Sequence, residues 1–471
     1  MADTFTAAPG TIGAGARLDR LPLGTFHRRI LALIAAGMFF DAFDIYLQGS
    51  LLGALVHDGW STPAINASFL SKTFLGMLIG ACAAGLIGDR FGRRASYQIN
   101  LAIFGLASLA AVFAPNMDTL IALRFVMGIG LGAEIVVGYG TLAEFIPPSH
   151  RGRWVGLLSL FTNLAVTATG FVSLAVIPTL GWRAMFVIVG LGAMAVWVAR
   201  KNMPESPRWL ESRGRLAEAE TILSAIEAEC GGTANLPTPN PSPAAAAQVP
   251  DRLSYLFSAQ MLRRTLLALL TGVTSTTVLY GFNGWLPTFL VKQGHGIVAT
   301  LAFTAVMGLG APVGSLLGSL IADRYGRRPG IVALSLSWAA FGVCYAYAGS
   351  NALLMAIGFG VMVSAYGLVS VGYAIYIPEL FPTQVRMRGA GLAGAAGRLA
   401  AAGAQYGVVW AFAFGGVAAV SAGMAALLVI LALVVLFAGV ETRQRSLESL
   451  ACKLGEAAPD PVGLLLVREN P

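Results

Sequence analysis

The chain has 471 residues, of which 56% are hydrophobic and 11% are charged, and its formal net charge is +8. Its mean hydropathy is +0.72. Soluble domains average about 25% charged residues, so this composition excludes an ordinary soluble enzyme and indicates a polytopic membrane protein. The positive charge is spread over tails and loops instead of lying on one face of a soluble domain, which excludes a nucleic-acid-binding protein.

Twelve apolar segments follow one another along the chain, each long enough to cross a membrane as a helix, which takes about 20 residues. They lie near 30–53, 66–88, 95–114, 119–146, 154–177 and 182–200, and then near 265–290, 298–321, 330–349, 352–378, 389–412 and 416–438. Outer-membrane barrels would show alternating segments of about 10 residues instead. The sequence therefore predicts an all-α membrane protein with two six-helix halves, residues 30–200 and 265–438.

Three segments lie outside these spans. Residues 1–29 form a short N-terminal tail, residues 439–471 form a C-terminal tail, and residues 201–264 form a central loop with helical spacing over 208–229 and a Pro-rich linker at 237–250. Basic residues gather in the tails and in alternate loops, whereas the opposite loops hold only Arg183 and Lys292. By the positive-inside rule, we expect an inner (plasma) membrane protein with both termini in the cytoplasm.

The two halves repeat each other's loop motifs. GLIGDRFGRR at 85–94 returns as SLIADRYGRR at 319–328, with Asp89 and Asp323 234 residues apart. EFIPPSHRGR at 144–153 returns as ELFPTQVRMRG at 379–389, with an offset of 235 residues. Two motifs that share one offset indicate two structurally similar halves, the architecture of alternating-access carriers.

These motifs resemble those of the major facilitator superfamily, over residues 28–445. The DRxGRR loop and its copy are the most specific signature. PESPRWL at 204–210 and ETR at 441–443 resemble the sugar-porter branch. DAFD at 41–44, RFVMGIGLGAE at 124–134, YGFNGWLPTFL at 280–290 and GAAGRLAAAGAQYG at 394–407 resemble the aromatic-acid and related metabolite:proton symporters. The resemblance implies a proton-coupled carrier.

We interpret the charged residues of the repeated loops as gates. Glycine in DRxGRR permits a tight turn, and the aspartate and arginines can pair across helix ends in one conformation and separate in another. Glu144 with Arg151 and Glu379 with Arg386 are expected to form further gate pairs. The alternatives are arginines that only set topology and solvated loop charges. The predicted gating residues are Asp89, Arg90, Arg93, Glu144, Arg151, Asp323, Arg324, Arg327, Glu379 and Arg386.

Several ionisable residues lie inside apolar spans, where a charge is costly unless it is paired or hydrated. Asp41 and Asp44 share one face of the first helix, and Arg124 on the fourth helix reaches a similar depth, so we expect Asp44 to pair with Arg124. A buried carboxylate whose affinity for a proton changes as an arginine approaches can carry a proton; the alternative is a static ion pair. The predicted proton-coupling residues are Asp41, Asp44, Arg124 and Glu134, and Lys72 is a weaker cavity candidate.

The C-terminal half offers one midplane cation, Arg398, in a Gly/Ala-rich helix. A fixed guanidinium favours an anion, and its planar fork favours a carboxylate. Tyr280 and Trp285 are candidates for stacking on a ring, although aromatics at helical spacing also serve packing, and Asn283 is a polar candidate beside them. Asn163 is the symmetry mate of Arg398. The predicted substrate-binding residues are Arg398, Asn283, Tyr280, Trp285 and Asn163.

These features predict a secondary active transporter that moves a small organic acid with protons, lies in the lipid bilayer and acts as a monomer. A sugar or polyol symporter is an alternative, but the seventh helix has threonines and a serine at 274–277, where sugar porters carry glutamines. An exporter and a carrier-like nutrient sensor are further alternatives. The four histidines fall in tails or loops and the four cysteines lack metal-site spacing, so we expect no enzyme, cofactor or metal centre.

Overall fold

The computed structural model describes residues 13–230, 253–381 and 385–442. Every regular element in these ranges is a helix, and nine helical stretches are long and apolar enough to cross a membrane. One of the nine, α17 (Arg386–Ala438), is long enough for two spans, which makes ten. The helices α4 and α14, of 19 residues each, add two more and complete the predicted twelve. The Pro-rich linker at 237–250 and the tail beyond residue 442 lie outside the described residues.

The N-terminal half has one continuous helix for each predicted span, and side-chain caps and prolines set several of the starts. Thr62 and Asn116 accept hydrogen bonds from the first turns of the helices that follow them, and Pro148 begins another helix where its missing N–H costs nothing. The helices are α2 (Thr25–His57), α3 (Pro63–Phe91), α4 (Arg93–Ala111), α5 (Met117–Phe145), α6 (Pro148–Leu180) and α7 (Arg183–Ala199).

The C-terminal half has the same number of spans, but several of them are interrupted. The span that corresponds to α5 changes to a π-helix midway. Gly415 and Gly416, where the backbone leaves helical angles and the second glycine has φ 61°, separate the two spans of α17. The elements are α10 (Leu262–Asn283), α11 (Leu286–Lys292), α12 (Ile297–Gly308), α13 (Gly310–Tyr325), α14 (Arg327–Tyr345), α15 (Asn351–Leu368), the π-helix η4 (Val369–Tyr376), α16 (Ile377–Glu379) and α17.

The internal repeat is visible in backbone geometry. Gly92 joins α3 to α4 at φ 96°, and Gly326 joins α13 to α14 at φ 103°. Both angles lie in the region that glycine adopts without strain. The two DRxGRR motifs therefore make the same tight turn, and the predicted relation between the halves holds at this point.

Close helix packing also repeats between the halves. A Cβ atom added to Gly80 of α3 would lie 1.9 Å from the carbonyl oxygen of Ile129 on α5, and one added to Gly314 of α13 would lie 2.3 Å from the carbonyl oxygen of Val363 on α15. Helices inside a membrane associate through such small residues, because lipid supplies no hydrophobic drive between helices. The two glycines are 234 residues apart, the offset of the loop motifs.

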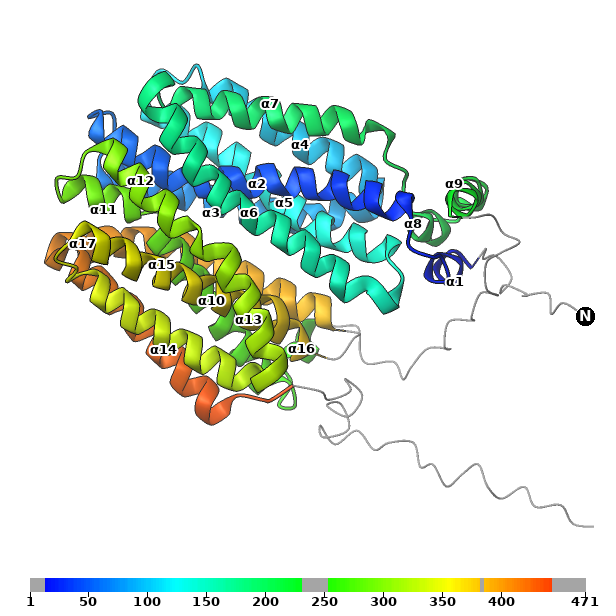
Figure 1. Ribbon diagram of the computed structural model, residues 1–471. Coiled ribbons are helices and arrows are strands. Elements are labelled where there is room, and N and C mark those ends of the chain that lie inside the picture. The colour runs from blue at the N-terminus through cyan, green and yellow to red at the C-terminus, as the bar shows by residue number, and fades with distance from the viewer. Residues whose placement is uncertain (1–12, 231–252, 382–384, 443–471) are drawn as a thin grey trace, which may run out of the picture.

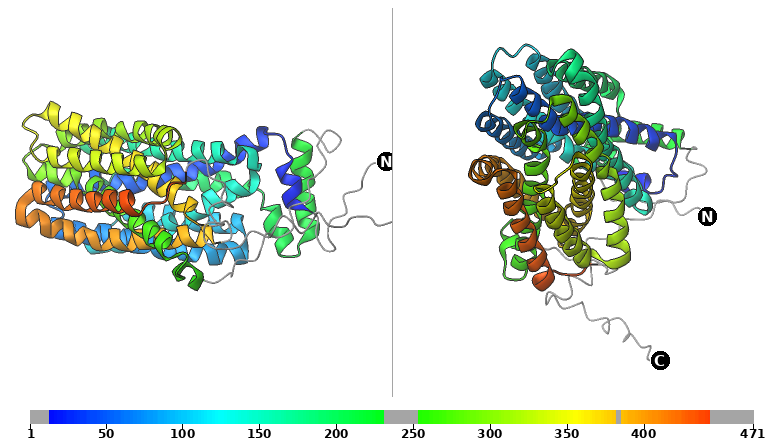
Figure 2. Two further views of the ribbon diagram at one scale, coloured as in Figure 1. Left: turned by 90° about the horizontal axis from the view of Figure 1, so that it is seen from below. Right: turned by 60° about the vertical axis from the view of Figure 1, so that its left-hand side comes forward.

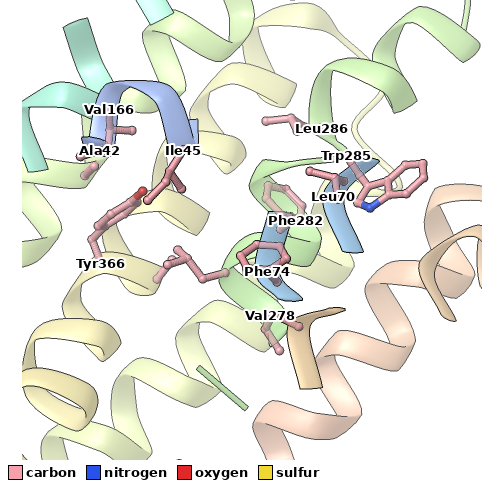
Figure 3. Close-up of a cluster of buried hydrophobic side chains, with 14 of the residues drawn as sticks. Ala42, Ile45, Leu70, Phe74, Val166, Val278, Phe282, Trp285, Leu286 and Tyr366 are labelled. Atoms are coloured by element: carbon pink, nitrogen blue, oxygen red, sulfur yellow. The ribbon is translucent and has the colours of Figure 1, made fainter. Parts of the chain in front are cut away.

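The two halves lie side by side, with their helices running in the same general direction (Figures 1 and 2). A single buried apolar cluster crosses the boundary between them (Figure 3). Ile45 and Phe74 of the N-terminal half belong to it, as do Phe282, Trp285 and Tyr366 of the C-terminal half. The core therefore continues from one half into the other.

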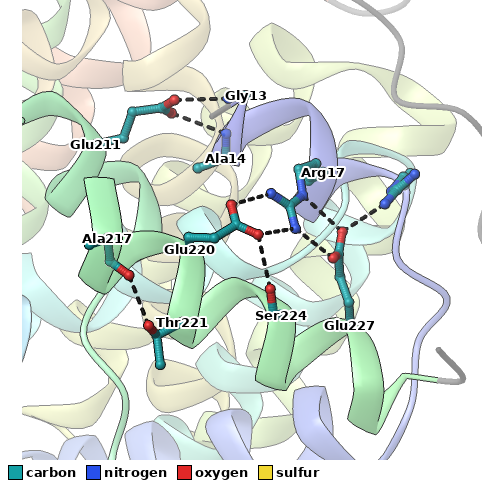
Figure 4. A network of polar contacts seen from close by, with 10 residues as sticks. Gly13, Ala14, Arg17, Glu211, Ala217, Glu220, Thr221, Ser224 and Glu227 are labelled. Atoms are coloured by element: carbon teal, nitrogen blue, oxygen red, sulfur yellow. Dashed lines mark hydrogen bonds and ion pairs between the residues drawn. The ribbon is translucent and has the colours of Figure 1, made fainter. Parts of the chain in front are cut away.

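Short helices gather at one end of the bundle, which we call the tail side (Figure 1). They are α1 (Ala14–Asp19), η1 (Arg200–Asn202), α8 (Pro207–Ser212) and α9 (Leu216–Glu229) on the N-terminal half, and η3 (Leu253–Phe257) before α10. Figure 4 shows α1 docked on α8 and α9: Glu211 accepts hydrogen bonds from the first amides of α1, and Arg17 pairs with Glu220 and Glu227. The segment predicted to be helical at 208–229 is thus tied to the N-terminal tail.

Candidate functional site

A buried ion pair joins α2 to α5. Nη1 of Arg124 lies 2.5 Å from Oδ2 of Asp44, and Nη2 donates a 3.1 Å hydrogen bond to the carbonyl oxygen of Asp44. Nε donates to the Thr73 hydroxyl at 3.3 Å. Both charged side chains are at most 1% exposed. A buried pair is favoured when its hydrogen-bonding groups are satisfied; the guanidinium has three oxygen acceptors and the sulfur of Met127, whereas Oδ1 of Asp44 has no partner among the described residues. The structure brings Asp44 and Arg124 together as the sequence predicts.

A second buried ion pair lies nearer to the tail side. Arg200, the first residue of η1, donates from Nη1 to Oε1 of Glu134 on α5. Its Nε and Nη2 donate to the carbonyl oxygens of Leu33 and Ile34 on α2, each at 2.9 Å, and its guanidinium lies 4.4 Å from the centre of the Tyr97 ring. The Glu134 and Arg200 side chains are 1% and 0% exposed. The pair therefore ties together α2, α5 and the end of α7.

Arg200 is not among the residues predicted from the sequence for this site. It is the last residue of the predicted span 182–200, and charges at helix ends normally reach the membrane surface. Glu134, however, stands inside an apolar span and needs a cationic partner. That requirement was the signal in the sequence, because Arg200 is the basic residue at the tail-side end of the sixth span.

Asp41 lies between the two pairs and belongs to neither. It is 1% exposed, and neither of its carboxyl oxygens has a hydrogen-bond partner among the described residues. Glu134, Arg200 and Asp44 are the charged groups that act on it. The four residues predicted for proton coupling thus form one buried cluster, completed by Arg200.

Two small cavities lie at the boundary between the halves. One, of about 40 Å³, is lined by Tyr46, Thr169, Asn283 and other residues of both halves, and the other, of about 10 Å³, is lined by Gln48, Asn283 and their neighbours. A single water needs roughly 10–15 Å³. These spaces hold a few waters at most, so neither has room for a substrate molecule in this conformation.

Two of the predicted substrate-binding residues reach these cavities. Asn283 lines both, and its amide donates to the Tyr366 hydroxyl at 3.4 Å. Tyr280 lines the smaller cavity, and its ring centre lies 4.8 Å from that of Phe74 on α3. The two side chains therefore stand where the halves meet.

The other two uncharged candidates make contacts of a different kind. Trp285 is 1% exposed, donates from Nε1 to Oε1 of Gln405 at 2.8 Å and stacks on Phe289, all within the C-terminal half. Asn163 of α6 donates to the Ser315 hydroxyl of α13 at 2.8 Å. The structure thus places Trp285 in the core of one half and Asn163 in a contact between the halves.

Arg398 lies half-buried on the first part of α17. A Cβ atom added to Gly394 would lie 3.2 Å from Nη1 of Arg398 and 3.0 Å from the Tyr373 hydroxyl, so the missing side chain lets those two groups converge beside the helix backbone. The positive charge of Arg398 also acts on Tyr280. Within the described ranges, its guanidinium makes no hydrogen bond and no ion pair, which leaves its donors available.

The N-terminal DRxGRR loop is held by two carboxylates. Arg93 donates from Nε and Nη2 to Oε1 of Glu144 at 3.0 and 2.8 Å. Glu205 of the PESPRWL motif accepts hydrogen bonds from the backbone amides of Arg93 and Arg94, and thus caps the start of α4, where a negative charge is favoured.

The C-terminal copy is held in the same way. Arg327 donates from Nε and Nη2 to the two carboxyl oxygens of Glu379 at 3.0 and 2.9 Å. Glu441 of the ETR motif accepts from the backbone amides of Arg327 and Arg328 at 3.0 Å. Both motifs that resemble sugar-porter signatures therefore provide a capping glutamate, a role that sequence analysis did not assign.

In this structure Glu144 and Glu379 pair with Arg93 and Arg327 instead of with the predicted Arg151 and Arg386. The turn at each glycine directs the second arginine of DRxGRR toward the facing glutamate, so Arg93 and Arg327 take those places. Arg151, on the first turn of α6, instead lies 3.9 Å from Asp19 of the N-terminal tail.

The remaining predicted gating residues surround these pairs. Asp323 lies 3.5 Å from Arg327, while Arg90 and Arg324 lie over the rings of their neighbours Phe91 and Tyr325. Arg386 begins α17. The side chain of Asp89 is outside the described part of the structure.

Two pseudo-symmetric six-helix halves, one of them with a buried charge cluster, are typical of a membrane carrier, and the chain belongs to the Major Facilitator Superfamily, whose family pattern it matches over residues 34–404. The predicted family is confirmed. Members of this family are transporters and not enzymes, so the chain is a transport protein for small molecules.

Individual relatives carry more specific names. The chain is 37% identical over 445 residues to the inner membrane metabolite transport protein YdjE of Escherichia coli, covering 93% of this chain and 98% of the relative. It is 33% identical over 442 residues to the niacin transporter NiaP of Acinetobacter baylyi, covering 92% and 98%. A gallate transporter of Pseudomonas putida is 30% identical over 382 residues, covering 79% and 82%.

Solved structures support the fold. The partially occluded inward-open form of the xylose transporter XylE from E. coli matches with a TM-score of 0.70 at 18% identity, over 90% of this chain and 100% of that one. At this level of identity the likeness concerns architecture and says nothing of the substrate.

Proposed function

We propose that the protein is a proton-coupled symporter for a small aromatic carboxylic acid, and that it works by alternating access as a monomer. The observation that carries this proposal is the half-buried Arg398, whose guanidinium has no hydrogen bond or ion pair within the described residues. A guanidinium in a membrane interior calls for an anionic partner, and a carboxylate fits its paired donors.

The surroundings of Arg398 favour an acid that carries a ring. The Tyr373 hydroxyl and the Arg398 guanidinium both lie beside Gly394. Tyr280 is close enough for the positive charge of Arg398 to act on it. Tyrosine rings offer flat apolar faces for stacking together with polar tips. Niacin and gallate, which give two of the relatives their names, are both aromatic carboxylic acids, and that chemistry matches this environment.

The Asp44–Arg124 pair supplies a coupling device in the other half. When Arg124 is within hydrogen-bond distance, Asp44 is stabilised as a carboxylate; when the helices shift and the arginine withdraws, desolvation favours the protonated acid. Rocking of the halves therefore changes the affinity of Asp44 for a proton. The ion pairs Arg93–Glu144 and Arg327–Glu379 each join helix ends within one half, and they hold those ends together during this motion.

The tail side corresponds to the cytoplasm in this proposal. The arginine-rich loops lie on that side together with α1 and the C-terminal residues 439–442, in keeping with the positive-inside rule. The membrane is the inner membrane, as in the name of the E. coli relative.

The test is uptake into proteoliposomes with an imposed pH gradient, acid outside. Labelled niacin, gallate and benzoate are compared with nicotinamide and xylose. We expect accumulation of at least one acid and none of the amide or the sugar, because a neutral amide cannot pair with Arg398. Accumulation of xylose, or equal transport of acid and amide, would contradict the carboxylate assignment, and transport only out of the vesicles down an inverted gradient would indicate an exporter.

A further inference from the structure

The five buried charged groups of the N-terminal half outnumber what one ion pair requires. Asp44 is paired with Arg124 and Glu134 with Arg200, so each pair is neutral as a unit. Asp41 is left over, and both of its oxygens lack partners in the described part of the chain. An unpaired carboxylate at 1% exposure is costly in an apolar interior, so Asp41 holds a proton in this arrangement.

The pair Glu134–Arg200 lies one helical turn from Asp41. A Cβ atom added to Gly37 would lie 2.7 Å from Oε1 of Glu134 and 2.6 Å from Cζ of Arg200, so the pair fills the notch that this glycine leaves in α2. Gly37 and Asp41 are four residues apart on the same face of α2, a step of about 6 Å along the helix toward the tail side. The second pair therefore lies next to Asp41, on its tail-side flank.

Glu134 has one free acceptor. Its Oε1 is bound by Arg200, whereas its Oε2 is buried and has no partner within the described residues. Arg200 does not depend on Glu134 alone, because the carbonyl oxygens of Leu33 and Ile34 hold two of its other nitrogens. If Glu134 takes up a proton, Arg200 thus keeps two acceptors and the site stays intact.

Polar groups lead from Glu134 to the tail side along α5. Thr141, 1% exposed, and Glu144 lie seven and ten residues further along the helix, a distance of about 15 Å at 1.5 Å per residue. Tyr97 of α4 lies beside this stripe and under Arg200. Glu144 lines an open cavity of about 330 Å³ together with Arg93 and Arg208, where water is accessible.

We propose that Glu134, positioned by Arg200, is the relay through which the coupling proton leaves the buried cluster toward the tail side. The proposal rests on the proton symport proposed above. When Arg124 returns to Asp44, the protonated Asp41 gives its proton to Oε2 of Glu134 and takes up the proton that Asp44 releases; from Glu134 the proton reaches water near Glu144. Only O–H bonds form and break, and one positive charge moves toward the tail side.

The charged and titratable groups that face this relay come from four elements. Asp41 and Asp44 lie on α2, Arg124 lies with Glu134 on α5, Tyr97 lies on α4, and Arg200 begins η1. Arg200 acts here as a positioning residue: it holds Oε1 of Glu134 and leaves Oε2 free to accept a proton.

The experiment compares Glu134→Gln with the double variant Glu134→Gln/Arg200→Met in proteoliposomes. Two assays are run: accumulation driven by a pH gradient, and counterflow exchange of labelled for unlabelled substrate, which needs no net proton release. We expect both variants to keep exchange within about threefold of wild type and to lose accumulation at least tenfold. The pair Arg17→Gln/Glu220→Gln on the tail-side surface is the matched control and should keep both activities.

A purely structural role gives a different result. Removing both charges of a buried pair together is often neutral for stability, whereas removing one is costly, so a structural pair predicts that the double variant regains accumulation. That outcome would overturn the relay. If Glu134→Gln fails to fold, Glu134→Asp serves instead: it keeps the charge but withdraws the carboxyl group, and it should slow accumulation while exchange stays near wild type.

The relay can fail while the proposed function holds. If Glu134→Gln still accumulates substrate on a pH gradient, as wild type does, while Asp44→Asn does not, the relay is wrong but proton symport stands. Wild-type uptake that ignores the pH gradient contradicts proton symport, and the relay with it.

Discussion

The two halves share a scaffold but differ in the charges they bury. Gly92 and Gly326 make the same turn, Gly80 and Gly314 make the same close approach, and Arg93–Glu144 matches Arg327–Glu379. Yet the N-terminal half buries five charged groups in one cluster, whereas the described part of the C-terminal half holds no such cluster and places the half-buried Arg398 near the boundary.

The difference is clearest at symmetry-related positions. At an offset of 235 residues, Asp41 corresponds to Thr276, Asp44 to Leu279, Arg124 to Phe359 and Glu134 to Val369. The shared helix arrangement therefore needs only the glycines, the turns and the Arg–Glu ion pairs at fixed spacing. The residues inside the two halves can differ. We infer a division of labour in which one half handles protons and the other holds the substrate.

The largest effect is expected for Asp44→Asn. Asparagine cannot carry a proton, so gradient-driven accumulation should fall to background while counterflow exchange remains, as measured in proteoliposomes. Thr276→Val, at the position related to Asp41 in the other half, should stay within about twofold of wild type. Accumulation by Asp44→Asn would show that the proton site lies elsewhere and would remove the contrast between the halves.

Arg398→Lys should lower the affinity for the acid more than tenfold, about 1.4 kcal/mol or more. Lysine keeps the charge but loses the paired donors of the guanidinium. Binding is measured by calorimetry on purified protein, with Arg388→Lys on the same helix as the control. Unchanged affinity would mean that Arg398 does not contact the carboxylate.

Gly80→Ala and Gly314→Ala test whether the scaffold is equivalent in the two halves. Each added methyl group meets a backbone carbonyl at 1.9 or 2.3 Å, so each variant should lose about 1–3 kcal/mol of stability, the usual cost of overpacking. Thermal unfolding in detergent measures this, and Gly403→Ala, where no atom lies within 4 Å, is the control. A large loss in one half only would show that the halves pack differently.

The smallest expected effect is on the binding of α1 to α8 and α9 at the tail-side surface of the N-terminal half. The hydrogen bond from Arg17 holds the pKa of Glu220 below its ordinary value. Burial opposes this at Glu227, but hydrogen bonds from Arg17 and Arg20 still lower its pKa. A lowered pKa stabilises docking above the ordinary pKa of about 4.3, and this stabilisation is lost as the pH falls through the lowered values.

Proteolysis at the N-terminus should therefore stay slow at pH 5–7 and accelerate only below about pH 4, the ordinary range of glutamate. Arg17→Gln should be cleaved quickly at neutral pH as well. Cleavage that is equally fast in wild type and variant across this range would show that the ion pairs do not hold α1 in place.

Sequence patterns predicted what depends on composition and spacing along one helix. The length of the apolar segments predicted the membrane-spanning helices, and the offset between repeated motifs predicted the two halves. Counting residues from the helix ends predicted that Asp44 and Arg124 lie at the same depth. The partner of Glu144 was mistaken, because the choice between Arg93 and Arg151 depends on how Gly92 turns the chain across helices. Arg200 was missed because its side chain runs back into the bundle instead of reaching the surface.

The docking of α1 has a further consequence for observing transport. Asp19 binds Arg208, and Arg208 in turn binds the carbonyl oxygen of Glu144, so the N-terminal segment is fastened to its own half, while Glu441 is fastened to the other. Helix α1 and the segment at Glu441 therefore each report the position of one half. A pair of spectroscopic labels, one on the exposed Thr221 of α9 and one on the exposed Arg324 of α13, would act as a ruler for the rocking angle without disturbing the buried charges or the substrate site.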